Sequence, residues 1–246
     1  MLPRQGKQGI WVARLVSFRS LRYAIHRALG LKTTRIEGLL VICDPAKINP
    51  DVARAIIRGT YELAERVLAR AAIRPGDKVL EIGTGVGVVG LLCTQFAGAG
   101  NVTSYEANAA LAPTIAENFA LNGLTPNLRL KAVTADGGPV TFFRNANVVS
   151  SSMVDRKLAA DQITVDSDPI NQALQDTGAA VIVMDVEGAE IDLLRAADLS
   201  GVREIIVEVH PHIMGEVPTQ AMVDDLCNRG FSVKQRQHKT VWLRRT

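Results

Sequence analysis

From residue 78 onward, apolar runs of strand length alternate with segments whose apolar residues recur at helical spacing. The pattern predicts strands over residues 78–82, 101–106, 127–133, 179–185 and 204–210. It predicts helices over residues 86–96, 109–121, 190–197 and 219–229. Such alternation indicates a doubly wound α/β fold, in which a mostly parallel sheet carries helices on both faces. The strand over 179–185 is apolar up to its final residue, as expected of a parallel strand buried on both faces.

The two ends of the chain depart from this alternation. Residues 231–237 and 240–244 are close enough to form a hairpin, which adds antiparallel pairing at one edge of the sheet. Ahead of the alternating region, the pattern predicts a short strand over 39–42 and a single helix over 51–72. We therefore divide the chain into an N-terminal arm (1–36), a strand with a lead-in helix (37–76) and the α/β domain (77–246).

The arm is the most strongly charged part of the chain. It carries eight Lys or Arg residues and no Asp or Glu, and its apolar residues recur at helical spacing. This predicts a basic amphipathic helix. Such a helix either packs on the domain with its basic face in solvent, or contacts a membrane surface or a polyanion.

Composition narrows the class of protein. The 246 residues are 47% hydrophobic and 22% charged, which suits one folded domain. Only 4% are aromatic and the net charge is +3, so nothing favours a nucleic-acid partner. Cys43, Cys93 and Cys227 are far apart, which predicts reduced, buried thiols in a cytoplasmic protein. With no long apolar run and no signal-peptide pattern, we expect neither a membrane-spanning helix nor a secretion signal.

The most informative segment is an apolar strand that passes directly into alternating glycines and then into a helix. It reads Val79-Leu80-Glu81-Ile82-Gly83-Thr84-Gly85-Val86-Gly87. Glycines at such a place let the backbone turn sharply and approach a ligand closely. The ligand would lie at the carboxyl end of the first strand, where open α/β sheets bind their ligands.

Two cofactors compete for this loop, and a glycine turn without a ligand is the third possibility. Gly85-x-Gly87-x-x-Gly90 matches the dinucleotide fingerprint, and an acid, Glu106, follows about 20 residues later. A true fingerprint should begin at the end of the strand. Counted from that point, its third position is Val88 instead of glycine. The spacing therefore disfavours NAD.

Glu81 points to the other cofactor. An acid near the end of a buried parallel strand is costly unless it meets a partner. The amino group of S-adenosylmethionine (SAM) would supply one, directly or through water, whereas NAD has no such group. We therefore predict that the loop binds SAM.

Several segments from about residue 37 onward resemble the FkbM-type family of SAM-dependent methyltransferases. They are Gly59-Thr60-Tyr61-Glu62, the glycine segment, Tyr105-Glu106-Ala107-Asn108, Asp185-Val186-Glu187-Gly188-Ala189-Glu190 and Glu208-Val209-His210. The run that begins at Asp185 is the most specific of these. The sequence departs from the family at Ala109, where proline often follows Glu-x-Asn.

The resemblance implies a class I methyltransferase (Rossmann-like) fold with a seven-stranded, mostly parallel sheet, and SAM as methyl donor. It implies cofactor contacts from Tyr61, Glu81, Gly83, Thr84, Gly85, Gly87, Glu106, Ala107, Val133, Asp136 and Asp185. Glu106 would hold the ribose hydroxyls, since a carboxylate accepts two hydrogen bonds. The adenine would lie near Val133 and Asp136, although Asp136 could equally be a turn residue before two glycines. Tyr61 and Glu62 would close over the methionine end, or simply occupy a helix surface.

Transfer of a methyl group to a hydroxyl also requires removal of a proton. We predict Asp185, Glu187 and His210 as catalytic residues, because they lie where neighbouring parallel strands end. His210 is the predicted base because imidazole titrates near neutrality, with Asp185 orienting the acceptor. Alternatively, Asp185 caps a turn and His210 is a loop residue. The three could also bind a divalent metal that orients a sugar diol, but no compact ligand motif is present and no metal is predicted.

We therefore expect O-methylation of a hydroxyl on a saccharide or another small natural product. The alternatives are an N-methyltransferase, an NAD(P)-dependent oxidoreductase, and a non-catalytic SAM-binding protein. Residues 137–161, with short strands over 140–143 and 163–165, are the expected place of acceptor contacts, since loops carry specificity on such scaffolds.

Overall fold

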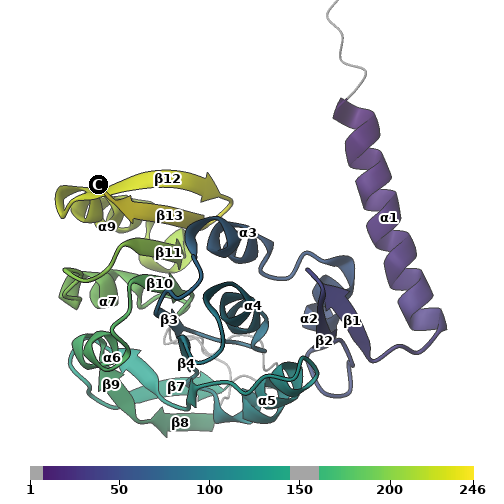
Figure 1. The fold of residues 1–246 in the computed structure, drawn as a ribbon, viewed down its shortest axis with the longest axis horizontal. Coiled ribbons are helices and arrows are strands. Elements are labelled where there is room, and N and C mark those ends of the chain that lie inside the picture. The colour runs from purple at the N-terminus through teal and green to yellow at the C-terminus, as the bar shows by residue number, and fades with distance from the viewer. Residues whose placement is uncertain (1–7, 145–160) are drawn as a thin grey trace, which may run out of the picture. The chain divides into compact units, whose positions relative to one another are not determined.

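The computed structural model describes residues 8–144 and 161–246 (Figure 1). The chain forms two compact units, Met1–Leu63 and Ala64–Thr246. The boundary lies inside the segment predicted to join the arm to the α/β domain. None of the described helices is both long enough and apolar enough to cross a membrane.

The N-terminal unit contains two helices and a β-hairpin. Its elements are α1 (Gln8–Ala28), β1 (Thr33–Ile36), β2 (Leu39–Ile42) and α2 (Pro50–Arg58). β1 pairs antiparallel with β2, so the predicted strand over 39–42 has a partner that the sequence pattern did not reveal. Arg22 of α1 donates hydrogen bonds to the Thr34 hydroxyl (2.6 Å) and to the backbone oxygen of Arg35 (2.8 Å). The end of α1 is thereby fixed to the hairpin.

The predicted helix of the arm is present as α1. Three large apolar residues of α1 are exposed, as is Leu29 directly after it: they are Phe18, Leu21 and Ile25. They recur at helical spacing, which is the amphipathic pattern seen in the sequence. Packing on the domain and contact with a membrane surface or a polyanion all stay predictions for the arm.

The single helix predicted over 51–72 is wrong. The chain forms α2 and a second helix, α3 (Leu63–Ala72). Gly59 ends α2 in the left-handed conformation (φ 71°), and its N–H bonds to the carbonyls of the last turn. Apolar residues recur at helical spacing on both sides of this cap, so the sequence pattern did not reveal that the helix ends at Gly59.

The second unit is built on the predicted seven-stranded sheet. Its strands are β3 (Val79–Ile82), β4 (Val102–Tyr105), β5 (Leu128–Arg129), β10 (Val181–Met184), β11 (Glu204–Glu208), β12 (Phe231–Gln237) and β13 (Thr240–Arg245). Their order is β12-β13-β11-β10-β3-β4-β5. The five strands from β11 to β5 are parallel, while β13 runs antiparallel to both β11 and β12. This confirms the predicted doubly wound sheet with its antiparallel C-terminal hairpin.

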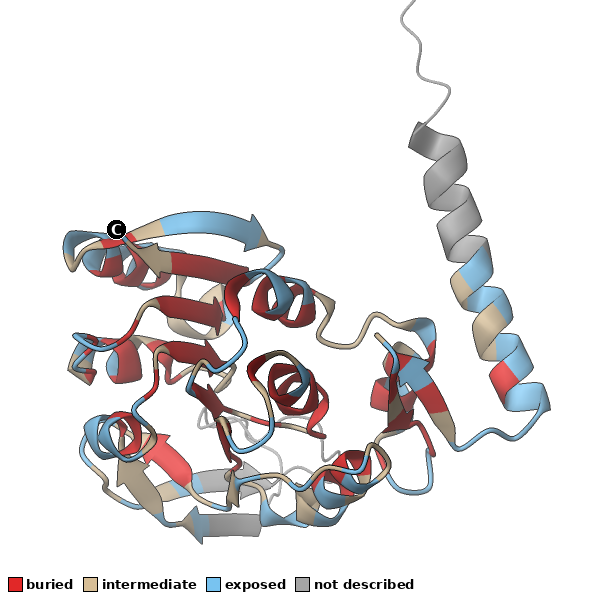
Figure 2. Ribbon diagram, in the orientation of Figure 1, coloured by how far each residue is buried: buried red, intermediate tan, exposed pale blue. Residues whose placement is uncertain are grey.

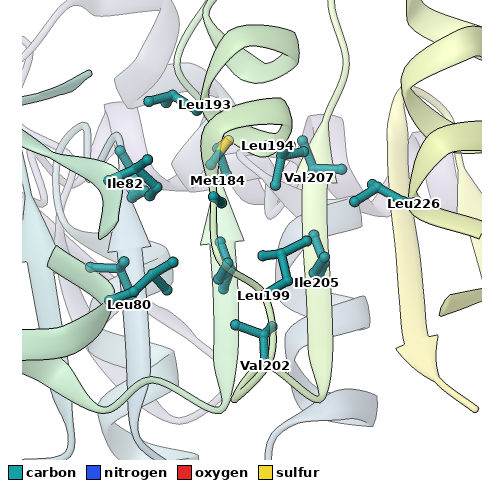
Figure 3. Close-up of a cluster of buried hydrophobic side chains, with 14 of the residues drawn as sticks. Leu80, Ile82, Met184, Leu193, Leu194, Leu199, Val202, Ile205, Val207 and Leu226 are labelled. Atoms are coloured by element: carbon teal, nitrogen blue, oxygen red, sulfur yellow. The ribbon is translucent and has the colours of Figure 1, made fainter. Parts of the chain in front are cut away.

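Helices bury both faces of the sheet (Figure 2). They are α3, α4 (Val88–Ala97), α5 (Ala112–Ala120), α6 (Ile170–Thr177), α7 (Glu190–Ala196) and α9 (Glu216–Asn228), with a 3-10 turn at Ala109–Leu111 before α5. The short helix α8 (Pro211–Met214) precedes α9 and has no buried residue. Successive strand residues point to opposite faces. Leu80 and Ile82 pack with Met184, Leu193 and Val207 on one face (Figure 3), and Val79 and Val181 pack with α3 and α4 on the other. Burial of both faces explains why these strands are apolar throughout.

The strand predicted over 127–133 is divided. β5 pairs with β4 in the sheet, whereas β6 (Ala132–Thr134) leaves the sheet and pairs with β9 (Ser167–Pro169). Two side-chain contacts fix the second pairing: Lys131 to Asp168 at 2.6 Å, and the hydroxyls of Thr134 and Ser167 at 2.9 Å. β7 (Val140–Arg144) and β8 (Asp161–Val165) form a separate antiparallel pair. Residues 145–160, most of the expected acceptor region, lie outside the described residues.

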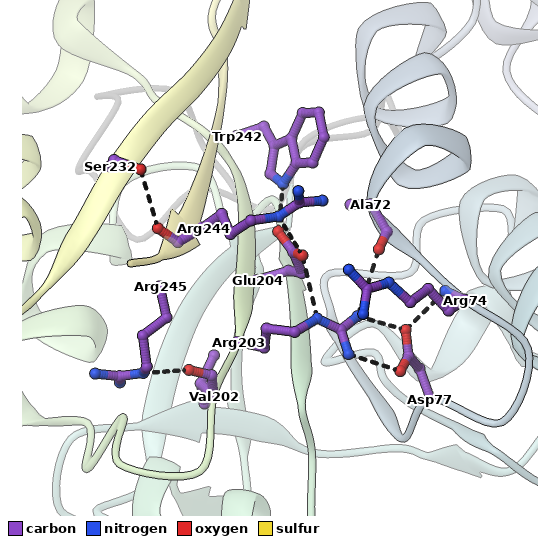
Figure 4. Close-up of polar contacts among 10 residues, drawn as sticks. All are labelled: Ala72, Arg74, Asp77, Val202, Arg203, Glu204, Ser232, Trp242, Arg244 and Arg245. Carbon is purple, nitrogen blue, oxygen red and sulfur yellow. Dashed lines mark hydrogen bonds and ion pairs between the residues drawn. The ribbon is translucent and has the colours of Figure 1, made fainter.

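A polar network lies at the edge of the sheet where β3 and β11 begin and the antiparallel strand β13 ends (Figure 4). Glu204, which is fully buried, accepts hydrogen bonds from Trp242 Nε1 (2.7 Å), Arg244 Nε (2.7 Å) and Arg203 Nε (3.1 Å). The guanidinium of Arg203 also donates hydrogen bonds to both carboxylate oxygens of Asp77, at 3.0 and 2.7 Å. Each carboxylate here has an arginine partner, and the network ties β11 and β13 to the turn before β3.

The three cysteines are free thiols. Cys43 and Cys93 are buried as predicted, but Cys227 is exposed. It lies on α9, whose buried side is formed by Met222, Val223 and Leu226. The prediction of burial was wrong for Cys227 because the residue falls on the solvent side of an amphipathic helix.

Candidate active site

Two glycines allow the loop after β3 to form a tight junction. A Cβ at Gly83 (φ 88°) would stand 1.7 Å from the backbone oxygen of Asp185, and one at Gly90 would stand 2.3 Å from Glu81 Oε2. Gly83 therefore brings the predicted cofactor loop directly against the segment that follows β10. Gly90 lets the Glu81 carboxyl lie against the first turn of α4.

Glu81 is buried beneath this loop, with 1% of its surface exposed. The Thr84 hydroxyl donates to its Oε2 at 3.0 Å. Burial raises the pKa of the carboxyl to about 7, even though hydrogen bonds from Ser104, Thr84 and Gly90 act in the opposite direction. Oε1 is buried and accepts no hydrogen bond from the described residues. Protein groups thus satisfy one oxygen, and the other is left for a further donor such as the predicted amino group.

Glu106 follows β4, the next strand of the sheet, and is 8% exposed. Its Oε2 accepts from the backbone N–H of Gly85 and its Oε1 from that of Asn108, both at 2.8 Å. These two bonds fix the carboxylate beside the glycine loop. Each oxygen keeps a second lone pair, so the group can still accept hydrogen bonds from a diol. Burial is the main cause of its raised pKa.

The residues predicted near the adenine differ in their surroundings. Val133 is 7% exposed and packs in the core with Tyr105 and Ile170. Asp136 is exposed, and its Oδ1 accepts the backbone N–H of Gly138 at 3.0 Å. Asp136 therefore forms the predicted turn before the two glycines, and its contact with adenine stays a prediction. Ala107 is partly exposed next to Glu106.

Tyr61 belongs to the N-terminal unit. Its backbone N–H donates to the backbone oxygen of Ala55 at 3.3 Å, in the chain reversal after α2. Its contact with a cofactor stays a prediction.

The structure brings together the three predicted catalytic residues. β10 and β11 are neighbours, with Met184 opposite Val207, so both strands end at the same edge of the sheet. His210 Nε2 lies 3.6 Å from Asp185 Oδ1 and 3.5 Å from Glu187 Oε2. The histidine is 2% exposed, and is therefore not a surface loop residue.

Three further acids complete this cluster and were not assigned to the site from the sequence. Glu190, which is fully buried, accepts from His210 Nδ1 at 2.8 Å, and Glu208 Oε1 lies 3.7 Å from Nε2. Both belong to motifs quoted for the family, and Glu208 shares a strand face with His210. Glu65 of α3 is buried, accepts from the Thr240 hydroxyl, and raises the pKa of both Asp185 and Glu208. No sequence signal connects Glu65 with residues more than a hundred positions away.

The charges in the cluster shift one another. Burial raises the pKa of Asp185 well above its usual range, and the neighbouring charge of Glu208 adds to the effect. Burial also raises the pKa of Glu208 to about 7. For His210, burial lowers the pKa, but the Glu190 hydrogen bond and the surrounding carboxylates outweigh it and raise the pKa to about 9. A pKa of about 9 lies above the neutral range on which the prediction of His210 as base relied, and its role as base stays a prediction.

Comparison with known proteins identifies the family of this chain. Residues 81–233 match the family described as the methyltransferase FkbM domain. The chain belongs to this family. The predicted resemblance is confirmed, and the protein is a methyltransferase. No curated protein matches the chain.

Solved structures with low sequence identity also align with it. A ribosomal protein L11 methylase from Lactobacillus delbrueckii subsp. bulgaricus is 16% identical with a TM-score of 0.46, over 76% of this chain and 80% of that one. Magnesium protoporphyrin IX methyltransferase from Synechocystis PCC 6803, with bound SAM, is 15% identical with a TM-score of 0.46, over 79% and 84%. The Pyrococcus abyssi tRNA (uracil-54, C5)-methyltransferase is 10% identical with a TM-score of 0.46, over 86% and 43%.

Proposed function

We propose that this protein uses SAM to methylate a hydroxyl oxygen of a small acceptor, with a saccharide as the favoured class. The observation that supports it most strongly is the junction of Gly83 with Asp185. It joins the loop suited to the donor to a cluster of carboxylates suited to a hydroxyl acceptor.

The residues present fit SAM. Glu106 offers a fixed, buried carboxylate to the ribose diol, and Glu81 Oε1 lacks a donor beneath the glycine loop. Both acids lie at the carboxyl ends of β3 and β4, where open α/β sheets bind ligands. When bound, SAM supplies an activated methyl group on a sulfonium sulfur.

The chain's own residues would position the acceptor and take its proton. Asp185 and Glu187 are partly exposed, with 27% and 36% of their side-chain surfaces accessible, so an acceptor can reach them. Carboxylates accept hydrogen bonds from hydroxyls, and several together can bind a polyol. His210, whose Nδ1 lies 2.8 Å from Glu190 Oε1, stands beside both carboxylates. Because positioning supplies much of the rate in such a transfer, their geometry is the main contribution of the protein.

The test is a screen of saccharides, other polyols and amines with SAM labelled in its methyl group. Label transferred to a hydroxyl supports the proposal, and label on nitrogen supports the N-methyltransferase alternative. Asp185→Asn should abolish most transfer. Asp192→Asn, whose side chain is 79% exposed on α7, is the matched control and should transfer at the wild-type rate. SAM binding with no transfer to any of these acceptors would contradict the proposed acceptor class.

A further inference from the structure

We infer that Asp185, Glu187 and His210 bind one divalent cation at the carboxyl ends of β10 and β11. The inference rests on the proposed function and makes it more specific, because the cation would bind the acceptor hydroxyl. One ligand atom from each of the three residues lies within 4.8 Å of the other two.

The distances suit a shared cation better than direct pairing. His210 Nε2 is 3.5–3.7 Å from one oxygen each of Glu187, Asp185 and Glu208. These separations exceed the range of about 2.7–3.2 Å for a good hydrogen bond. Two neighbouring ligands of one cation, with bonds of about 2.0–2.4 Å, stand roughly 3–3.5 Å apart. A small movement of the carboxylates would close the shell around an ion.

His210 is oriented as a metal ligand. Its side chain is 3% exposed, and Nδ1 lies 2.8 Å from Glu190 Oε1, which itself is fully buried. A ligating histidine commonly donates its other ring N–H to a carboxylate in this way, which fixes the tautomer and directs the free nitrogen at the metal. Here that arrangement directs Nε2 at the two carboxylates.

An independent observation is the orphaned oxygen of Asp185. Oδ1 is buried and has no hydrogen-bond partner among the described residues, although the side chain as a whole is 27% exposed. The same atom lies 3.6 Å from Nε2, inside the cluster. Within the described part of the chain, no arginine or lysine forms an ion pair with Asp185, Glu187 or Glu208. A divalent cation bound at Nε2 in place of the imidazole proton would be a partner for Oδ1, and it would carry one more positive charge than that proton.

The donor set selects among cations. Imidazole nitrogen suits transition metals, and carboxylate oxygen suits Mn²⁺ as well as Mg²⁺ and Ca²⁺. One imidazole with two carboxylates therefore favours Mn²⁺ or Zn²⁺ over an ion that prefers an all-oxygen shell. Waters or the acceptor would complete the coordination.

The test is titration of the full chain, treated with chelator, with Mn²⁺ alone, following the free ion by its EPR signal. We expect one bound equivalent in the wild type and at least tenfold weaker binding in Asp185→Asn and in Glu187→Gln. The control Asp192→Asn should bind as the wild type does. Glu187 is 36% exposed, so its variant should fold even if the Asp185 variant does not.

Folded wild-type protein that binds no Mn²⁺ would overturn the cation site, as would Glu187→Gln with unchanged affinity. Neither result affects the methyltransferase proposal, because the titration contains no SAM and no acceptor. Conversely, one bound Mn²⁺ lost in the variants, together with no methyl transfer in the acceptor screen, would leave the cation site and refute the proposed function.

Discussion

Buried acidic side chains have opposite surroundings at the two ends of the sheet, the amino end where the parallel strands begin and the carboxyl end where they finish. At the amino end, Glu204 and Asp77 are bound by Arg203, and Arg244 adds a second contact to Glu204 (Figure 4). At the carboxyl end, a larger group of acids surrounds one histidine. An internally balanced network is a structural device, whereas an unbalanced one needs protons, a ligand or an ion. We therefore propose that the first network holds the fold and that the second takes part in the chemistry.

The titration of individual groups follows the same division. Burial alone would raise the pKa of Asp77, but the hydrogen bonds and charge of Arg203 outweigh it and leave the pKa below its usual value. With no such partner, the pKa of Asp185 is raised. The difference lies in the partner and not in the carboxyl, since both side chains are largely enclosed.

The largest expected effect concerns function at the carboxyl end. Asp185→Asn should lower turnover by roughly 10²–10⁴-fold, the usual loss when a group that moves or positions the proton is removed. The free energy of unfolding should stay equal or increase, because one negative charge leaves a cluster with an excess of them. Turnover with the acceptor identified in the screen, and urea unfolding, measure the two quantities. If Asp185→Asn keeps wild-type turnover, Asp185 has no role in the reaction. If the variant is active but less stable than the wild type, the role of Asp185 is structural.

The amino end should respond in the reverse manner. Arg203→Ala removes the partner of Asp77 and one of the partners of Glu204, so the free energy of unfolding should fall by about 3 kcal/mol. The matched control, Arg195→Ala, breaks an exposed pair at 4.0 Å and should change it by less than about 0.5 kcal/mol. SAM affinity should be unchanged in both variants. If Arg203→Ala is as stable as the control, the arginine contacts at the amino end do not contribute measurably to the free energy of unfolding.

Much of this contrast follows from the sequence. Parallel strands end at one edge of a sheet, so the apolar runs before Asp185 and Glu208 were enough to predict that acids gather there. The glycine segment likewise predicted the junction at β3. Glu65 could not be found in this way, because its approach depends on how α3 packs. The break at Gly59 and the departure of β6 were also hidden, since a cap or a side-chain pairing can end an element without interrupting its periodicity.

Glu81 is buried without a cationic partner in the described ranges of the chain, so it can show how burial alone changes the stability of the fold with pH. Its pKa is about 7 in the fold and about 4.5 in an unfolded chain, so the unfolded state releases its proton first as pH rises. Between pH 4.5 and 7, wild-type stability should therefore fall by roughly 3 kcal/mol relative to Glu81→Gln, which has no such proton. Unfolding by urea at several pH values measures this difference. Exposed Glu216→Gln should keep the wild-type slope. If the free energy of unfolding depends on pH in the same way for the wild type and Glu81→Gln, burial does not raise the pKa of this carboxyl.

The smallest expected effect is at Glu106, whose surroundings are intermediate between those of the two ends of the sheet. This acid is buried like Glu204, yet its partners are two backbone N–H groups instead of arginines. Those amides orient the carboxylate without neutralising it, which suits a group that must bind neutral hydroxyls. Glu106→Gln should keep one acceptor but place an amide donor against a backbone N–H. Hydrogen bonds to a charged group contribute about 1.5–3 kcal/mol, so SAM affinity should fall at least tenfold. Calorimetry with SAM and with NAD measures it. Unchanged SAM affinity in the folded variant would exclude Glu106 from the cofactor site, and heat from NAD alone would reverse the cofactor assignment.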